Sequence, residues 1–444
     1  MTRMILAMTA AALLPGSALG QPLANPDPLP AIDGADREAI VDSVARSIRD
    51  VYVFPDVGEK MAKLIEKNVR GRKYDGAARP GDFADMLTQD LQSVSKDLHL
   101  SVRAGGPYVA PANDDEEQAE YEAQMARMAR DNYGWKKIER MEGNIGYVKL
   151  DGFVDAAHAG ATAIAAMNFL ANVDALIFDL RTNGGGSPSM IQLITSYLFD
   201  ERTHLNSFYV RSSDSMEQYW TQAFVEGPRI TDVPVYVLTS NFTFSAAEEF
   251  SYNLKNLERG VIVGETTGGG AHPVEMHTFS FDGYSISMSL PFGRAVNPVT
   301  GTNWEGTGVE PDIAVPASEA LDAAVEDALV NLMDGADNDR KHALQWSLDG
   351  YRARRNPVVL SESAALAYAG KYGPRNVRLE GGALYYQRTG RPEIRMIPLG
   401  DDRFSLEGLD FFRIEFVRDD TGRVVEFVGR YQDGRSDSNP RTDS

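Results

Sequence analysis

The chain has 444 residues, 43% of them hydrophobic and 24% charged, and its formal net charge at pH 7 is −20. This length allows more than one domain with a sizeable core. So negative a protein is a poor partner for nucleic acid or for anionic lipid. The sequence contains no cysteine, which excludes disulfides, thiolate nucleophiles and zinc–thiolate sites.

Residues 1–20 have the pattern of a signal peptide. Arg3 precedes an apolar, alanine-rich run, and Ala18-Leu19-Gly20 has the small residues of a cleavage site. No later run of about 18 apolar residues predicts a membrane span. We therefore expect a periplasmic or secreted protein that is not inserted in a membrane.

Residues 36–104 are predicted to form an N-terminal helical bundle, because three stretches place apolar residues at helical spacing. An acidic segment at 113–134 follows, and its charges predict a solvated helix or a linker. The three apolar faces of the bundle are Ile40, Val44, Ile48 and Val51; Val57, Met61, Leu64 and Ile65; and Phe83, Leu87, Leu91 and Val94.

Residues 140–335 alternate strand and helix patterns, which favours a right-handed, largely parallel α/β core. The alternating segment 278–289, with a turn at Asp282-Gly283, predicts an antiparallel hairpin added to this core. We predict strands at 145–150, 175–180, 235–238 and 261–263, and helices at 157–170, 188–198, after Ser245 and at 317–333.

The C-terminal part of the chain has a different pattern. The stretch from 334 to 363 is polar and basic and is interpreted as a linker. Short strand patterns separated by glycine-rich turns then predict a separate all-β domain at 364–435.

Ser245 lies where the strand predicted at 235–238 passes through a polar turn into a helix. The free N–H groups of a first helical turn and the helix dipole favour negative charge. An attacking oxygen, and the oxyanion that it generates, would be stabilised there. A serine at a helix start is most often only an N-cap, so this interpretation needs support from other residues.

Two further stretches offer that support. A hydroxyl nucleophile needs a base, and His99 follows Asp97 at the end of the helical domain. In 179–186 a predicted strand runs into three consecutive glycines, which let backbone N–H groups aim at one point. A tight turn without a ligand would give the same glycine pattern.

Together these stretches resemble the tail-specific or C-terminal processing serine proteases, and more closely the branch with tricorn protease and the interphotoreceptor retinoid-binding protein. The likeness covers about residues 39–315 and implies a crotonase-like (ClpP-like) β-α superhelical core with serine peptidase activity on peptides or proteins. Four motifs occur in the family's order: Asp-Leu-Arg-Thr-Asn-Gly-Gly-Gly at 179–186, Thr-Ser-Asn-Phe-Thr-Phe-Ser-Ala-Ala-Glu at 239–248, Gly-Glu-Thr-Thr-Gly-Gly-Gly at 264–270 and Gly-Thr-Gly-Val-Glu-Pro-Asp at 306–312.

The resemblance also implies which type of base acts. Members of the Ser-Lys type have a lysine in the stretch that here is Gly269-Gly270-Ala271, and no lysine occurs between Lys255 and Lys341. The tricorn-like type takes a histidine from before the core and a glutamate from after the serine, which His99 and Glu305 match.

The roles implied by the family are those of a triad: Ser245 attacks, His99 transfers the proton and Glu305 orients the imidazole. The backbone N–H groups of Gly185 or Gly186 and of Ala246 are expected to form the oxyanion hole. No metal or cofactor is expected.

Three alternatives remain open: a different base, a non-catalytic binding module and an esterase. His272 is a rival base 27 residues after Ser245, although a loop histidine without catalytic role is the simpler interpretation. The segment between His99 and the strand at 145–150 is too short for the family's PDZ-type domain, so tail-specific cleavage is not expected. A non-catalytic module that binds retinoid, another hydrophobic ligand or a peptide could share the fold; an esterase is less favoured, because no G-x-S-x-G motif is present.

Overall fold

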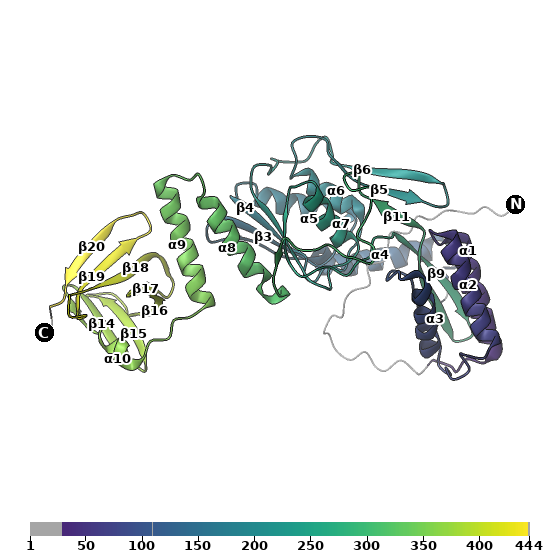
Figure 1. Cartoon of the computed structure of the whole chain (residues 1–444), viewed down its shortest axis with the longest axis horizontal. Helices are drawn as coiled ribbons and strands as arrows, with labels where there is room; N and C mark the ends of the chain where they lie inside the picture. The colour runs from purple at the N-terminus through teal and green to yellow at the C-terminus, as the bar shows by residue number, and fades with distance from the viewer. Residues whose placement is uncertain (1–28, 109, 443–444) are drawn as a thin grey trace. The chain divides into compact units, whose positions relative to one another are not determined.

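The computed structural model describes residues 29–108 and 110–442 (Figure 1). The signal peptide predicted at 1–20 lies outside the described residues. The chain divides into two compact units, one of residues up to 140 with 146–324, the other of 141–145 with 325 onward. Within the described ranges, no helix combines the length and apolar character needed to cross a membrane.

The first unit begins with the three predicted helices, α1 (Gly34–Val51), α2 (Pro55–Arg70) and α3 (Pro80–Ser95). The side chain of Asp33 caps α1 in a capping box, and proline begins α2 and α3, where its fixed φ suits the first turn. Their apolar faces form one hydrophobic core.

The predicted hairpin is present as β9 (Val274–Phe281) and β10 (Tyr284–Pro291), but its predicted place was wrong. It does not extend the parallel sheet. It forms a separate sheet in the order β1-β10-β9 with β1 (Ser101–Gly105), and Ile286 and Met288 complete the core of the helices. Alternation in the sequence indicates a strand but does not identify its partner.

The α/β core is a six-stranded sheet in the order β12-β8-β7-β4-β3-β2. Strands β4, β7, β8 and β12 pair in parallel, and β4 and β7 are buried throughout, as in sheets that are covered on both faces. The bounds are β2 (Trp135–Met141), β3 (Ile145–Leu150), β4 (Ala175–Asp179), β7 (Val235–Thr239), β8 (Val261–Gly264) and β12 (Ile313–Ala314), with helices α5 (Ala156–Phe169), α6 (Pro188–Ser196) and α7 (Ala246–Asn256).

Two other features complete this unit. A three-stranded sheet of β11 (Gly293–Val296), β5 (His204–Val210) and β6 (Ser215–Trp220) was not predicted, because β6 is polar and mostly exposed. The acidic segment forms α4 (Asp114–Arg130), none of whose residues is buried, followed by the short η1 (Asn132–Gly134).

The second unit contains the predicted all-β domain as an eight-stranded sheet whose strands pair antiparallel in chain order. Its strands are β13 (Gly370–Tyr372), β14 (Arg375–Glu380), β15 (Ala383–Arg388), β16 (Ile394–Gly400), β17 (Arg403–Leu406), β18 (Leu409–Arg418), β19 (Val424–Tyr431) and β20 (Ser436–Pro440).

The linker predicted over 334–363 was wrong. After η2 (Ala317–Glu319) and α8 (Ala320–Met333), the chain forms α9 (Asn338–Arg355) and the short α10 (Glu362–Leu366). Helix α9 buries Leu344, Trp346 and Leu348 among charged residues, and the Arg413 guanidinium lies 3.9 Å from the centre of the Trp346 ring. Its few apolar residues explain why the sequence suggested a linker.

Candidate active site

Ser245 is held in an unusual backbone conformation at the turn between β7 and α7. Its φ is 56° and its ψ is −122°. A residue with a Cβ in such a region stores about 1–3 kcal/mol of strain, whereas an ordinary N-cap residue has an extended backbone. A strained serine between a strand and a helix is the arrangement that exposes a nucleophilic hydroxyl.

The buried carboxylate of Glu248 fixes this corner. Its Oε2 accepts the N–H groups of Ser245 at 2.8 Å and Gly270 at 2.9 Å. Its Oε1 accepts the N–H of Gly269 and the hydroxyl of Thr267, both at 2.6 Å. Burial raises the pKa of Glu248, and these hydrogen bonds oppose that shift. The serine corner and the glycine loop are thus held by one side chain.

The predicted oxyanion glycines lie against the serine corner. Gly185 and Gly186 have φ values of 115° and 142°. A Cβ on Gly185 would lie 2.7 Å from the Cβ of Ser245, and one on Gly186 would lie 2.1 Å from the carbonyl oxygen of Phe153. Only glycine allows the chain to approach the serine this closely.

The two glycines differ in the state of their N–H groups. The Gly185 N–H donates to Oδ1 of Asn183 at 2.9 Å. The hydrogen bonds of the described residues include none donated by the N–H of Gly186 or of Ala246. Two unoccupied donors therefore flank Ser245, and of the two glycines Gly186 is the better candidate donor.

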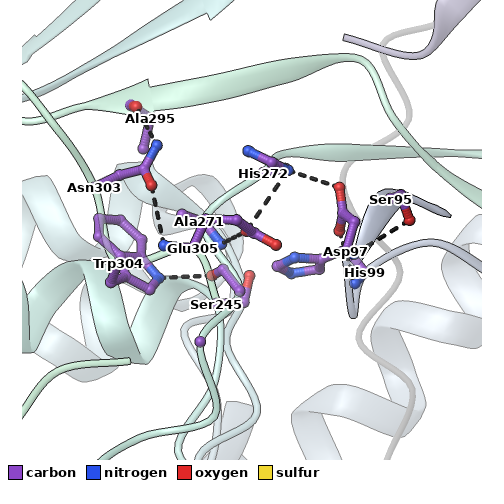
Figure 2. Close-up of polar contacts among 12 residues, drawn as sticks. Ser95, Asp97, His99, Ser245, Ala271, His272, Ala295, Asn303, Trp304 and Glu305 are labelled. Atoms are coloured by element: carbon purple, nitrogen blue, oxygen red, sulfur yellow. Dashed lines mark hydrogen bonds and ion pairs between the residues drawn. The ribbon is translucent and has the colours of Figure 1, made fainter. Parts of the chain in front are cut away.

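His99 reaches this corner from the N-terminal helices. Lys96, the residue after the last of α3, caps the helix with a φ of 61°, and Oδ1 of Asp97 then accepts the backbone N–H of His99 at 3.0 Å. The imidazole centre lies 4.5 Å from that of Phe244, the residue before Ser245. Figure 2 shows the ring between the side chains of Ser245 and Asp97.

The environment of His99 keeps its ring neutral. The ring is half-buried, but its Nδ1 is enclosed and has no hydrogen-bond partner among the described residues. Burial lowers the pKa of His99 to about 4; Asp97 opposes this shift and His272 adds to it. A neutral imidazole at pH 7 can accept a proton.

Glu305 lies on a turn that Asn303 and Trp304 brace. The Glu305 N–H donates to Oδ1 of Asn303 at 3.0 Å, and Nε1 of Trp304 donates to the carbonyl of Gly270 at 2.6 Å. Oε2 of Glu305 accepts the N–H of Ala271 at 2.6 Å. Its Oε1 is enclosed and finds no partner within the described part of the chain.

The charge of Glu305 depends on its neighbours. The pKa of Glu305 is raised to about 7, mainly by burial and next by Asp97, while His272 acts to lower it. One ligand atom each of Asp97, His99 and Glu305 lie within 4.8 Å of one another. Such a group could hold a metal ion, and an imidazole and a carboxylate this close could also pair if their separation shortened to hydrogen-bond length.

Sequence reasoning missed two residues near the candidate site, Glu248 and Tyr52, and one contact of Asp97. Glu248 had a signal, the serine-x-x-glutamate pattern at a helix start. No sequence pattern indicated Tyr52 or the contact between Asp97 and His272. Oδ2 of Asp97 accepts the Tyr52 hydroxyl at 3.3 Å and lies 2.7 Å from Nδ1 of His272. His272 lies in a loop, as predicted, but it is 5% exposed and contacts Asp97.

Comparisons with known proteins show which families and proteins this chain resembles. Residues 144–315 match the family model described as peptidase family S41, and residues 35–133 match the model described as the N-terminal domain of Peptidase_S41 in eukaryotic IRBP. Tricorn protease of Thermoplasma volcanium is 29% identical over 178 residues, which cover 40% of this chain and 16% of that protein.

A chloroplastic carboxyl-terminal-processing peptidase 2 of Arabidopsis thaliana is 29% identical over 184 residues, which cover 39% of this chain and 32% of that protein. The chain thus spans less than a third of the length of these two relatives. Among solved structures, a photosystem II D1 C-terminal processing protease aligns with 63% of this chain and 93% of its own, with 17% identity and a TM-score of 0.39.

Proposed function

This chain belongs to peptidase family S41, and from that membership and the geometry of its site we propose that it is a serine peptidase with a Ser245-His99-Glu305 triad. Its substrates would be peptides or proteins. We propose in addition that the core is crotonase-like, which the parallel pairing of β4, β7, β8 and β12 supports. The pattern of residues 1–20 supports export.

The observation that carries the proposal is that Nδ1 of His99 and Oε1 of Glu305 are both enclosed and unpaired beside a strained serine. A buried polar atom without a partner costs about 1–3 kcal/mol. One ring nitrogen of His99 lies within 4.8 Å of one carboxylate oxygen of Glu305, so rotation of the two side chains would have to bring Nδ1 and Oε1 into a hydrogen bond. That hydrogen bond would leave Nε2 of His99 for the hydroxyl of Ser245.

The proposed reaction proceeds in two halves. Oγ of Ser245 attacks the scissile carbonyl carbon while His99 accepts the hydroxyl proton, and the N–H groups of Gly186 and Ala246 stabilise the oxyanion. His99 then gives the proton to the leaving amine, which forms an acyl-enzyme. Water, deprotonated by His99, attacks the acyl carbon and releases the acid and the free Ser245 hydroxyl. Ionised Glu305 stabilises the imidazolium in both halves.

A fluorophosphonate probe tests the proposal, because it phosphonylates an activated serine hydroxyl. We expect wild type to be labelled at Ser245, Ser245→Ala not to be labelled, and His99→Ala to be labelled several decades more slowly. Lys255→Ala is the matched control: Nζ of Lys255 lies 2.6 Å from the carbonyl of Glu310 and 2.7 Å from Oδ1 of Asp312, so its loss should leave labelling unchanged.

The results also separate the alternatives. A loss in Lys255→Ala as large as that in His99→Ala would indicate a lysine base. A folded wild type that neither labels nor hydrolyses peptides would overturn the proposal and favour the non-catalytic binding module.

A further inference from the structure

A second histidine–carboxylate pair lies beside the proposed triad. Nδ1 of His272 is 2.7 Å from Oδ2 of Asp97 and 3.6 Å from Oε2 of Glu305. His272 is 5% exposed and Asp97 1%. An ionised carboxylate accepts hydrogen bonds only, so the contact with Asp97 places a proton on Nδ1 of His272. Figure 2 shows His272 and Asp97 facing each other beside Glu305.

We propose that His272 and Asp97 are positioning residues for the triad: their pairing sets the place of the His99 ring and the charge balance around Glu305. This inference rests on the proposed function, since it assigns a task to residues around the same site. Neither residue is proposed to touch substrate or the reacting atoms.

The His272–Asp97 pair joins two segments of the site. Asp97 fixes the backbone of His99 through the 3.0 Å hydrogen bond to its N–H, and both precede Leu100 in the core of the N-terminal helices. His272 follows the glycine loop that Glu248 ties to the serine corner. The His272–Asp97 contact therefore links the segment that carries the base to the loop held with the nucleophile.

Neighbouring groups hold this link in place. The Tyr52 hydroxyl donates to the same oxygen of Asp97 as His272, and Phe54 lies edge-on to the His272 ring at 5.6 Å between centres. If His272 were displaced, Asp97 would keep the hydrogen bond from Tyr52 and lose only its contact with His272. Asp97 would then shift, and the His99 ring would move with Asp97.

The pair also affects the charge of the site, in which two carboxylates, those of Asp97 and Glu305, lie close together. Asp97 raises the pKa of Glu305 and of His99, whereas His272 lowers both. Tyr52, Glu248, His99 and Glu305 are the other titratable groups that act on this cluster. Loss of His272 removes the group that lowers these two pKa values and leaves Asp97, which raises them. Loss of the charge of Asp97 removes the raising effect and leaves His272, which lowers them. The two changes must therefore shift the titration of the triad in opposite directions.

The test compares His272→Gln, Asp97→Asn and their combination with wild type, by kcat and KM for a fluorogenic peptide as a function of pH. We expect kcat to fall about 10- to 100-fold in each single variant, with KM little changed, and the double variant to lose less than the product of the two. The acid limb of kcat/KM should move to higher pH in His272→Gln and to lower pH in Asp97→Asn.

The matched control is His277→Gln. His277 lies five residues further along, and its Nε2 is 2.7 Å from Oε1 of the half-exposed Glu275, away from Asp97. It should behave as wild type. An NMR titration of the His99 imidazole in an otherwise inactive Ser245→Ala background measures the same shifts without turnover, and circular dichroism confirms that each variant is folded.

The inference would be overturned if the acid limb of kcat/KM did not move, if it moved in the same direction in both single variants, or if the loss of kcat in the double variant equalled the product of the two single losses. The pair would then have only a packing role. A loss in His272→Gln as large as that in His99→Ala would make His272 the base instead. A wild type that is not labelled by the fluorophosphonate would overturn the proposed function as well, whereas a labelled wild type with unmoved limbs would overturn this inference alone.

Discussion

Glu248 and Gly270 are joined by a hydrogen bond of 2.9 Å from the backbone N–H to Oε2, the oxygen that also accepts the N–H of Ser245. Both oxygens of this fully buried carboxylate face donors only. The nucleophile corner and the loop that leads to His272 are therefore braced by a group that no amide can replace.

We predict that Glu248→Gln lowers the free energy of unfolding by about 2–4 kcal/mol, because the amide NH₂ turns a donor toward two donors and leaves buried N–H or O–H groups unpaired. The rate of hydrolysis should fall as well, since Ser245 loses its anchor. Urea unfolding measures the first effect, with Glu275→Gln on the half-exposed β9 as control. A change within about 0.5 kcal/mol would show that the brace is unimportant.

A second prediction concerns the strain at Ser245. Ser245→Gly should abolish hydrolysis and yet raise the free energy of unfolding by about 1 kcal/mol, because glycine adopts a φ of 56° without strain. Ser245→Ala should abolish hydrolysis without that gain. If the serine were only a cap, the glycine variant would be less stable than wild type by a few tenths of a kcal/mol. Urea unfolding of wild type, Ser245→Ala and Ser245→Gly measures these free energies and so distinguishes a strained serine from a simple cap.

The ionisation of Glu305 should determine how kcat/KM changes with pH. Burial raises the pKa of Glu305 to about 7, so below that pH the carboxyl is neutral and cannot stabilise an imidazolium. We expect kcat/KM to rise through about pH 7 as Glu305 ionises. In Glu305→Gln, kcat should fall steeply and the limb should move to lower pH, because burial holds the pKa of the remaining group, His99, near 4. An unmoved limb with near-normal rates would remove Glu305 from the mechanism.

Glu249 gives a prediction for stability alone. It is 3% exposed, and burial raises its pKa to about 7, with Asn206 and Asn253 opposing the shift. Because the folded-state pKa exceeds the unfolded value of about 4.5, the contribution of Glu249 to stability is full below pH 4.5 and is lost as the pH rises to 7. The loss amounts to about 3 kcal/mol.

Glu249→Gln should therefore be more stable than wild type at pH 8 and close to it at pH 4.5. Thermal unfolding at the two pH values measures the difference, with the exposed Glu310→Gln as control. A stability difference that does not change with pH would show that Glu249 titrates normally in the folded protein.

Local patterns in the sequence were enough for much of the fold. The apolar periodicity of α1 to α3 and the buried runs of β4 and β7 depend on neighbouring residues, and these elements lie where they were predicted. The pairing of β1 with β10 and the helix α9 were not predicted, because each depends on partners distant in the chain.

The same distinction applies to the candidate site. Ser245, His99 and Glu305 were singled out from motifs, and the structure places His99 near Glu305 and against Phe244, the residue before Ser245. The contact between Asp97 and His272 joins residues 175 positions apart, and no local pattern encodes it. The choice between Gly185 and Gly186 as donor likewise required the position of the Asn183 side chain.

The proposed base and nucleophile adjoin different hydrophobic cores. Leu100, next to His99, packs with the N-terminal helices, while Ala246 and Trp304, next to Ser245 and Glu305, pack in the α/β core. Separation of the two cores by about 1 Å would slow the proposed triad by about 100-fold while both cores stay folded. Turnover is then a more sensitive gauge of sub-global opening than circular dichroism, and inactivation by mild denaturant should precede unfolding of either core.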